Sequence, residues 1–202
     1  SRSCPFSSKC LGVNFIETAT KAMCGAEEPL TALERTTPVG DFVGVKAPMF
    51  SFQRLKGADP SLGVEMSSTG EVACFGETGE DAFLKALMST GMKLPKQNVL
   101  VSIQEKLRTA ETLEPLKTLN ELGYSLFATV NTAEFLKENG VDVTMLEYAA
   151  EDGSNADSAN LIDSYVSDSK IDLVLMFSNQ YSTNVISNYA IRRLAVDYGI
   201  PL

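Results

Sequence analysis

From residue 93 onward, apolar and polar positions alternate between two kinds of segment. Val99–Ile103 is a continuous apolar run, typical of a strand buried on both faces. Leu113, Leu116 and Leu119 recur at helical spacing up to a stop at Gly123. Further strands are predicted at Tyr124–Val130, Val141–Tyr148 and Ile171–Phe177, and a fifth strand begins at Ile200. Further helices are predicted between these strands, at Thr132–Asn139, Ser158–Ser167 and Thr183–Tyr198. The pattern predicts an α/β fold with a five-stranded parallel, Rossmann-like sheet.

Two details of these helices are also predicted. Thr132 is a good N-cap for the helix that follows it, and Gly140 a good stop. In the last helix we expect an inward face made by Ile186, Tyr189, Ala190, Leu194 and Tyr198.

Residues 1–92 have a less regular, Gly- and Pro-punctuated pattern. Phe15–Met23 is a predicted helix, Glu27–Asp41 a surface loop and Phe42–Lys46 an edge strand ended by Pro48. A helix over Asp81–Met88 would bury Ala82, Phe83, Ala86 and Leu87. No pattern closes a complete core within this stretch. We therefore divide the chain into residues 1–92, part of a domain, and residues 93–202, a whole one.

The amino-acid composition excludes several classes of catalytic site and binding partner. The chain has no histidine, which excludes Ser-His-Asp and Cys-His catalysis and His-ligated zinc. Its net charge of −9 gives no general attraction for nucleic acid or an anionic membrane face, and no apolar run is long enough to span a membrane. Its four cysteines lack CxxC spacing, so we expect free, buried thiols in a reducing, intracellular compartment and no metal site.

Small polar residues follow the predicted strands where a parallel sheet binds ligands, at the carboxyl ends of its strands. Thr129 and Thr132 lie at one strand-to-helix turn, where both hydroxyls could face one carboxylate or phosphate, and Tyr148 ends the third strand. Helix capping alone also accounts for each such residue. The carboxylates Asp142, Glu147 and Asp172 are interpreted as solvated surface charges, and no dinucleotide or P-loop fingerprint is present.

Several separated motifs, in order, resemble the C-terminal end of the large chain of carbamoyl-phosphate synthetase, over all 202 positions. They are Ser1-Arg2-Ser3 with Pro5-Phe6 and Lys9, then Lys46–Phe50, Gly63–Met66, Ser68–Val72, and Asn188-Tyr189 with Ile191–Arg193. The resemblance implies that residues 1–92 are the C-terminal remnant of an ATP-grasp, carbamate-phosphorylating domain. It implies that residues 93–202 are a methylglyoxal-synthase-like allosteric domain.

The resemblance further implies that the intact enzyme, a ligase, makes carbamoyl phosphate from bicarbonate, ATP and ammonia or glutamine, with magnesium. This fragment is not expected to be catalytically competent or to bind either cofactor. Arg2 carries over as a contact to phosphate in the incomplete ATP-grasp site. The implied partners are a small-molecule effector, the rest of the large chain and a glutaminase subunit or domain. The implied location is the mitochondrial matrix or the cytoplasm.

Family members differ in their effector. Bacterial members, linked to pyrimidine biosynthesis, respond to UMP through a Thr pair and a Lys at the end of the third strand. Urea-cycle and arginine-linked members respond to N-acetyl-L-glutamate, with an aromatic residue replacing that Lys and Asn residues after the fourth strand. The corresponding positions here are Thr129, Thr132, Tyr148, Asn179 and Asn188. This chain differs from the second pattern in having Tyr148 where Trp is usual, and Met176 where another Asn is usual.

Three hypotheses follow. The first is an allosteric module for N-acetyl-L-glutamate. It is favoured because Tyr148 stands where the UMP-type members have a lysine, and losing that positive charge weakens binding of a phosphate dianion more than binding of a carboxylate. The second is the same module reading a pyrimidine nucleotide or phosphoribosyl pyrophosphate, with Lys106 and Arg108 supplying charge. The third is a docking or oligomerisation surface with a vestigial pocket.

Overall fold

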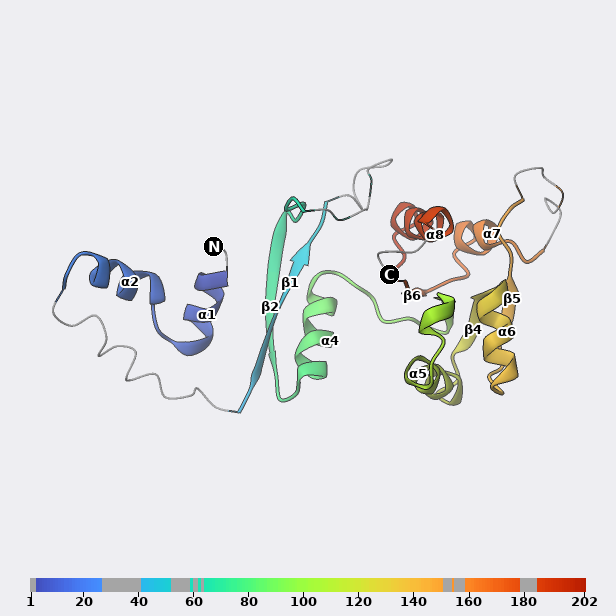
Figure 1. Ribbon diagram of the computed structural model, residues 1–202, viewed down its shortest axis with the longest axis horizontal. Helices are drawn as coiled ribbons and strands as arrows, with labels where there is room; N and C mark the ends of the chain where they lie inside the picture. The colour runs from blue at the N-terminus through green and yellow to red at the C-terminus, as the bar shows by residue number, and fades with distance from the viewer. Residues whose placement is uncertain are drawn as a thin grey trace. The chain divides into compact units, whose positions relative to one another are not determined.

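The computed structural model describes residues 3–26, 41–51, 59, 62, 64–150, 154, 159–178 and 185–202. The chain divides into two compact units (Figure 1). The first contains the elements up to residue 92, and the second contains those from residue 93 to the end. Each unit is described separately below.

In its described residues, the first unit combines a two-stranded antiparallel sheet with three helices. Its elements are α1 (Ser3–Leu11), α2 (Phe15–Met23), β1 (Val43–Met49), β2 (Gly70–Gly76) and α4 (Gly79–Ser89). Helix α4 packs on one face of the sheet, and α1 reaches the other face through stacked rings of Phe6 and Phe75. Thr78 caps α4 by accepting a hydrogen bond from the backbone N–H of Asp81.

Some sequence predictions for this unit need correction. Strand β1 continues through Pro48, which is tolerated because each strand of a two-stranded sheet has an unpaired edge. Helix α4 buries Ala82 and Ala86, but Phe83 is exposed. The helix at Phe15–Met23 is confirmed, α1 was not predicted, and the loop predicted at Glu27–Asp41 lies almost wholly outside the described residues.

The second unit is a parallel four-stranded sheet in the order β5-β4-β3-β6. Its strands are β3 (Asn98–Ile103), β4 (Ser125–Thr129), β5 (Thr144–Leu146) and β6 (Leu173–Phe177). Its helices are η2 (Glu105–Leu107, a 3-10 turn), α5 (Ala110–Glu121), α6 (Val130–Glu138), α7 (Ile162–Ser167) and α8 (Val185–Asp197). The α/β class and the parallel sheet are confirmed.

The predicted fifth strand does not form in the described residues. Pro201 accepts one hydrogen bond from the backbone N–H of Val174 in β6, at 2.9 Å, and residues 200–202 are not a strand. The sheet therefore has four strands, with β6 at one edge and β5 at the other.

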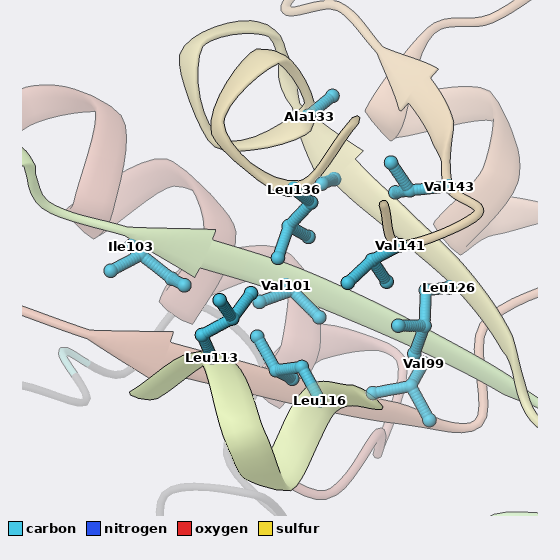
Figure 2. Packing of buried hydrophobic residues seen from close by; sticks show 11 residues of the cluster. Val99, Val101, Ile103, Leu113, Leu116, Leu126, Ala133, Leu136, Val141 and Val143 are labelled. Atoms are coloured by element: carbon cyan, nitrogen blue, oxygen red, sulfur yellow. The ribbon is translucent and has the colours of Figure 1, made fainter. Parts of the chain in front are cut away.

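Alternate residues of the central strand point into two separate apolar layers. On one face, Val99 and Val101 of β3 pack against α5 and α6; Figure 2 shows Leu116 and Leu136 of these helices converging on the strand. On the other face, Leu100 packs with residues of α7 and α8. Since β3 is covered on both faces, its continuous apolar run is explained, and the prediction for it is confirmed.

The last helix buries a face that overlaps the predicted one only in part. Among its residues with described side chains, Ile191 and Ala195 are buried and Leu194 packs against the same apolar cluster, as predicted, whereas Tyr189 and Tyr198 are exposed. The side chain of Ile186 lies outside the described part of the chain. None of the helices in the described ranges is long and apolar enough to cross a membrane.

Candidate functional site

The carboxyl ends of the four strands meet at one edge of the sheet. The register pairs Thr129 of β4 with Leu146 of β5, and Ile103 of β3 with Phe177 of β6. The chain moves outward from β3 through β4 to β5, and then returns to the far side of β3 as β6. The carboxyl edge beside β3 and β6 is thus the switch point at which open α/β sheets bind ligands.

Two of the predicted site residues are in direct contact at this edge. The Thr129 hydroxyl donates to the Thr132 hydroxyl oxygen, with 3.0 Å between the two oxygens. Thr129 ends β4, and Thr132 lies in the first turn of α6. The turn between them therefore brings the two hydroxyls together. That both hydroxyls face one ligand stays a prediction.

The structure corrects the capping role that the sequence gave to Thr132. Helix α6 begins at Val130, so its N-cap is Thr129, and the Thr129 side chain makes no capping hydrogen bond. Thr132 is instead 1% exposed and lies on the buried side of the helix with Ala133 and Leu136. Capping therefore explains neither hydroxyl.

Thr132 ties the start of α6 to the end of β3. Its hydroxyl oxygen accepts the backbone N–H of Ile103 at 3.0 Å, and its proton is donated to the Ile103 carbonyl at 3.3 Å. Backbone pairing between β3 and β4 ends at Val101. The Thr132 side chain therefore bonds the β3 backbone at Ile103, beyond the point where β4 pairs with it. The sequence reasoning missed this role of Ile103, and the one available signal was that Thr132 adjoins the apolar positions of its helix.

Arg108 lies at the same end of β3. Its Nε–H donates to the Ile103 carbonyl at 3.3 Å, the same oxygen that receives the Thr132 proton. This contact holds a half-buried guanidinium group close to the carboxyl edge. Lys106, the other cation proposed for this loop, lies in η2 and is exposed.

Tyr148 follows β5 at the same edge. Glu147 forms a parallel bridge with Leu161, which fixes the chain immediately before Tyr148. The half-buried Tyr148 ring packs against the apolar cluster on the α7 and α8 face. This places an aromatic side chain one strand away from the Thr129–Thr132 pair.

The other predicted site residues are not positioned by the structure. Arg2 and Asn179 lie outside the described residues. Asn188 belongs to α8, but its side chain is not described. The structure therefore brings together Thr129 and Thr132, places Tyr148 at the same edge, and leaves the remaining three as predictions.

Asp172 is not the solvated surface charge that the sequence suggested. Its carboxylate accepts the backbone N–H groups of Gln97 and Asn98 at 2.9 and 2.8 Å, joining β3 to the segment before β6. Burial by itself would raise the pKa of Asp172, but these two donors and the nearby Lys96 hold it below its usual value. This contact lies at the amino ends of the strands, opposite the candidate site.

The described residues offer neither a metal centre nor the buried thiols that were expected. No group of three or more Cys, Asp or Glu side chains in the described ranges is arranged to hold a metal ion. Cys10 and Cys74 are free and half-buried, and Cys24 is free and exposed, so the expectation of burial was wrong for these three. What the carboxyl edge does offer is hydroxyls, an aromatic wall and one guanidinium group, a set suited to holding a small polar molecule.

The sequence of this chain is similar to that of known proteins. Residues 111–202 match the MGS-like domain. The whole chain is 49% identical to part of the multifunctional protein pyrABCN of Emericella nidulans, and 46% identical to part of the mitochondrial carbamoyl-phosphate synthase [ammonia] of Homo sapiens. It is also 46% identical to part of the multifunctional protein CAD of Squalus acanthias.

The chain spans only a small part of these relatives, 9% of the two multifunctional proteins and 14% of the human synthase. Each match nevertheless covers 100% of the chain, so the first unit shares the relationship with the second. Through residues 111–202 the chain belongs to the MGS-like domain family, and over its full length it is related to a segment of the carbamoyl-phosphate synthases.

Proposed function

We propose that this chain is the regulatory region of a carbamoyl-phosphate synthetase and that its second unit binds N-acetyl-L-glutamate as an allosteric effector. The observation that carries the proposal is the Thr129–Thr132 pair at the carboxyl edge of an MGS-like sheet. Helix α6 begins directly after Thr129, so its unpaired amides and positive dipole end also lie at this edge. A carboxylate bound there would meet both a hydroxyl and the helix N-terminus.

Tyr148 supports an acylated amino acid over a phosphate. A phosphate dianion depends on a point charge in addition to hydrogen bonds, whereas an acyl chain gains from an apolar wall. Tyr148 supplies such a wall from β5, and its ring is held in place by packing on the second apolar cluster. In this proposal Asn179 and Asn188 supply further hydrogen bonds to the ligand from the β6 side.

A phosphorylated nucleotide such as UMP is the second candidate, and Arg108 is the observation that favours it. Its Nε–H is bonded to Ile103, so a cationic group lies at the end of β3, near the Thr pair. Guanidinium groups bind phosphate in a two-pronged fashion and carry a permanent charge. The relatives include multifunctional proteins as well as ammonia-type synthases at similar identity, so their names do not separate the two effectors.

For the parent protein we propose ATP-dependent synthesis of carbamoyl phosphate from bicarbonate and ammonia or glutamine, with magnesium. The first unit would be the end of the ATP-grasp domain, where Arg2 contacts phosphate. The proposed partners are the effector, the remainder of the synthetase chain and a glutaminase, in the mitochondrial matrix or the cytoplasm. Effector occupancy would control the rate of carbamoyl phosphate synthesis in that assembly.

Thermal unfolding of the 202-residue chain tests the effector, with N-acetyl-L-glutamate and UMP titrated separately. A ligand at 100 times its dissociation constant stabilises the folded state by about 2.7 kcal/mol, roughly 5–10 °C for a chain of this size. We expect a shift with N-acetyl-L-glutamate that is lost in Thr129→Val. A shift with UMP alone would support the nucleotide effector. No shift with either, together with a mass that depends on protein concentration, would support a docking or oligomerisation module.

A further inference from the structure

We infer that Asn139 is a site of spontaneous deamidation, that the C-terminal cap of α6 protects this site, and that the reaction product destabilises the same cap. Asn139 is the one asparagine in the 202-residue sequence that glycine follows directly. Asparagine is thermolabile because its side-chain amide can react with the backbone of the next residue. The reaction uses only the chain and water, so it does not depend on the proposed effector site.

Deamidation at this position proceeds through a cyclic intermediate. The Gly140 amide nitrogen loses its proton and attacks Cγ of Asn139, the Cγ–Nδ2 bond breaks, and Nδ2 takes up a proton and leaves as ammonia. The product is a succinimide ring. Water then adds to a ring carbonyl and opens the ring. Opening on one side gives aspartate, and opening on the other gives isoaspartate, in which the main chain runs through the former side-chain carbon.

The position of this residue pair in the chain favours the reaction. Asn139 and Gly140 are both exposed, so water reaches the side-chain amide and the backbone. Gly140 has no Cβ atom, so no side chain hinders the approach of its nitrogen to Cγ. The same helix offers a comparison in Asn131, which is also exposed but is followed by Thr132. The branched Thr132 side chain crowds the nitrogen that would have to attack.

The end of α6 has the bonding of a Schellman motif. Asn139 is the C-cap residue, and Gly140 follows it with a φ of 76°. The Gly140 N–H donates to the Lys137 carbonyl at 3.0 Å, and the Val141 N–H donates to the Leu136 carbonyl at 3.0 Å. The side chains of Leu136 and Val141 are both buried in the apolar cluster on the α5 and α6 face. This apolar contact accompanies the motif and stabilises it.

The folded cap keeps the reacting groups apart. Asn139 Nδ2 donates to the Phe135 carbonyl at 2.8 Å, which turns the side-chain amide back toward the preceding turn of the helix. The ψ angle of Asn139 is 15°, so the Gly140 nitrogen lies on the side of the Asn139 nitrogen and not on the side of Cβ. Attack on Cγ therefore requires the side-chain amide to leave Phe135 and the Gly140 N–H to leave Lys137. Only an open cap can react.

The rate of deamidation should consequently report how often the last turn of α6 opens. A helix end can open by itself with a smaller free energy than unfolding of the whole domain. When opening and closing are fast compared with the chemistry, the observed rate follows the equilibrium population of the open form. A contact that stabilises the cap therefore slows the reaction, and the buried Val141 side chain is such a contact.

The products of deamidation weaken the cap. An aspartate at position 139 cannot donate to the Phe135 carbonyl, and it carries a negative charge at the negative end of the helix dipole. Isoaspartate adds a carbon to the backbone between positions 139 and 140, so the two backbone bonds of the motif no longer fit the same turn. Either product increases the population of the open cap.

Incubation of the 202-residue chain at neutral pH tests the site, with samples taken over several days and sequenced by fragmentation mass spectrometry. The replacement of an amide NH2 by OH changes the mass and identifies the residue. We expect Asn139 to convert in guanidinium chloride, and about tenfold or more slowly in the native protein. Asn131 is the internal reference and should stay intact. An unreacted Asn139 in denaturant would show that it is no deamidation site, and equal rates in both conditions would show that the cap gives no protection.

Two matched valine variants test whether the opening is local. Val141→Ala and Val174→Ala remove the same atoms from buried positions, but Val174 lies in β6 and in the other apolar layer. Val141→Ala should speed native deamidation of Asn139 by about threefold or more, and Val174→Ala by less than about twofold. Equal acceleration would mean that the whole unit must open, and would overturn the protective role of the cap.

The effect of the product is tested with Asn139→Asp and Asn131→Asp, which make the same chemical change at opposite ends of α6. Asn139→Asp should lower the melting temperature by roughly 2–5 °C, whereas Asn131→Asp should leave it unchanged or raise it, because a negative charge is favourable near a helix N-terminus. Equal melting temperatures for the two variants would show that the product does not weaken the cap.

Discussion

The carboxylate of Asp172 holds the backbone N–H of Asn98, 74 residues earlier in the sequence, at 2.8 Å. The same oxygen accepts the N–H of Gln97, so one side chain fixes the start of the central strand β3 against the segment that leads into β6. Because the bound form is the charged carboxylate, this connection depends on pH.

Asp172→Asn should lower the free energy of unfolding at pH 7 by about 1–3 kcal/mol, because an amide accepts hydrogen bonds more weakly than a carboxylate. The folded-state pKa of Asp172 lies below its usual value, so its contribution is complete above the unfolded-state pKa and is lost as the pH falls through the folded-state pKa. Urea unfolding at pH 7 and at pH 3 measures both. The difference between the two proteins should shrink as the pH is lowered, whereas exposed Asp142→Asn should match the natural chain at pH 7.

Leu116 of α5 and Leu122, the C-cap residue of the same helix, provide a matched test of the apolar core. Leu116 is 1% exposed and contacts β3 from below in Figure 2, whereas Leu122, at the end of the same helix, is 70% exposed. Leu116→Ala should lower the free energy of unfolding by about 2–5 kcal/mol, and Leu122→Ala by less than about 0.5 kcal/mol. Chemical denaturation of the two variants measures the difference. Similar losses would contradict the described packing of α5.

Two glycines around α4 test the first unit in the same way. A Cβ atom at Gly76 would lie 2.5 Å from the backbone nitrogen of Ala82, and a backbone atom cannot give way as a flexible side chain can. A Cβ at Gly79 would meet open space. Gly76→Ala should therefore destabilise the unit by at least about 1–3 kcal/mol, while Gly79→Ala should have little effect. Limited proteolysis combined with thermal unfolding would detect the loss, and an intact Gly76→Ala protein would show that α4 packs differently.

Tyr148→Lys tests the choice between the two effectors. A lysine replaces an apolar wall by a point charge, so N-acetyl-L-glutamate should bind several-fold more weakly and UMP more tightly. Calorimetric titration of both compounds against both proteins measures the change in ranking. Tyr165→Phe is a useful control, since Tyr165 packs against the same apolar layer but its ring lies against Phe127 of β4. The opposite ranking would overturn N-acetyl-L-glutamate as the preferred effector.

The sequence predicted those parts of the fold for which one physical signal dominates. The apolar run of β3 is typical of a strand covered on both faces, and Gly123 and Gly140 end helices because each adopts a positive φ. The buried face of helix α8 was harder to predict, because apolar residues occur around the whole circumference of the helix. Its two tyrosines were assigned to the core, but a phenol needs a polar partner there, and the smaller Ile191 and Ala195 fill the space instead.

At the candidate site the sequence predicted which residues meet but not what they do. Thr129 and Thr132 are both good caps, and a spacing of three allows either one to begin the helix. Which of the two threonines begins α6 depends on where β4 ends. That end is set by the pairing of β4 with β5 and not by any local preference. The tie from Thr132 to Ile103 joins positions 29 residues apart and leaves no periodic trace in the sequence.

The strand order β5-β4-β3-β6 also constrains how the second unit is assembled during synthesis. Among the described strands of this unit, β3 is the first to emerge from the ribosome, and β6, its partner on one side, is the last. Until β6 emerges, β3 presents an apolar face and an open hydrogen-bonding edge. Such high contact order slows folding and prolongs exposure to aggregation, so nascent chains of this protein should depend on chaperones until residue 177 is available.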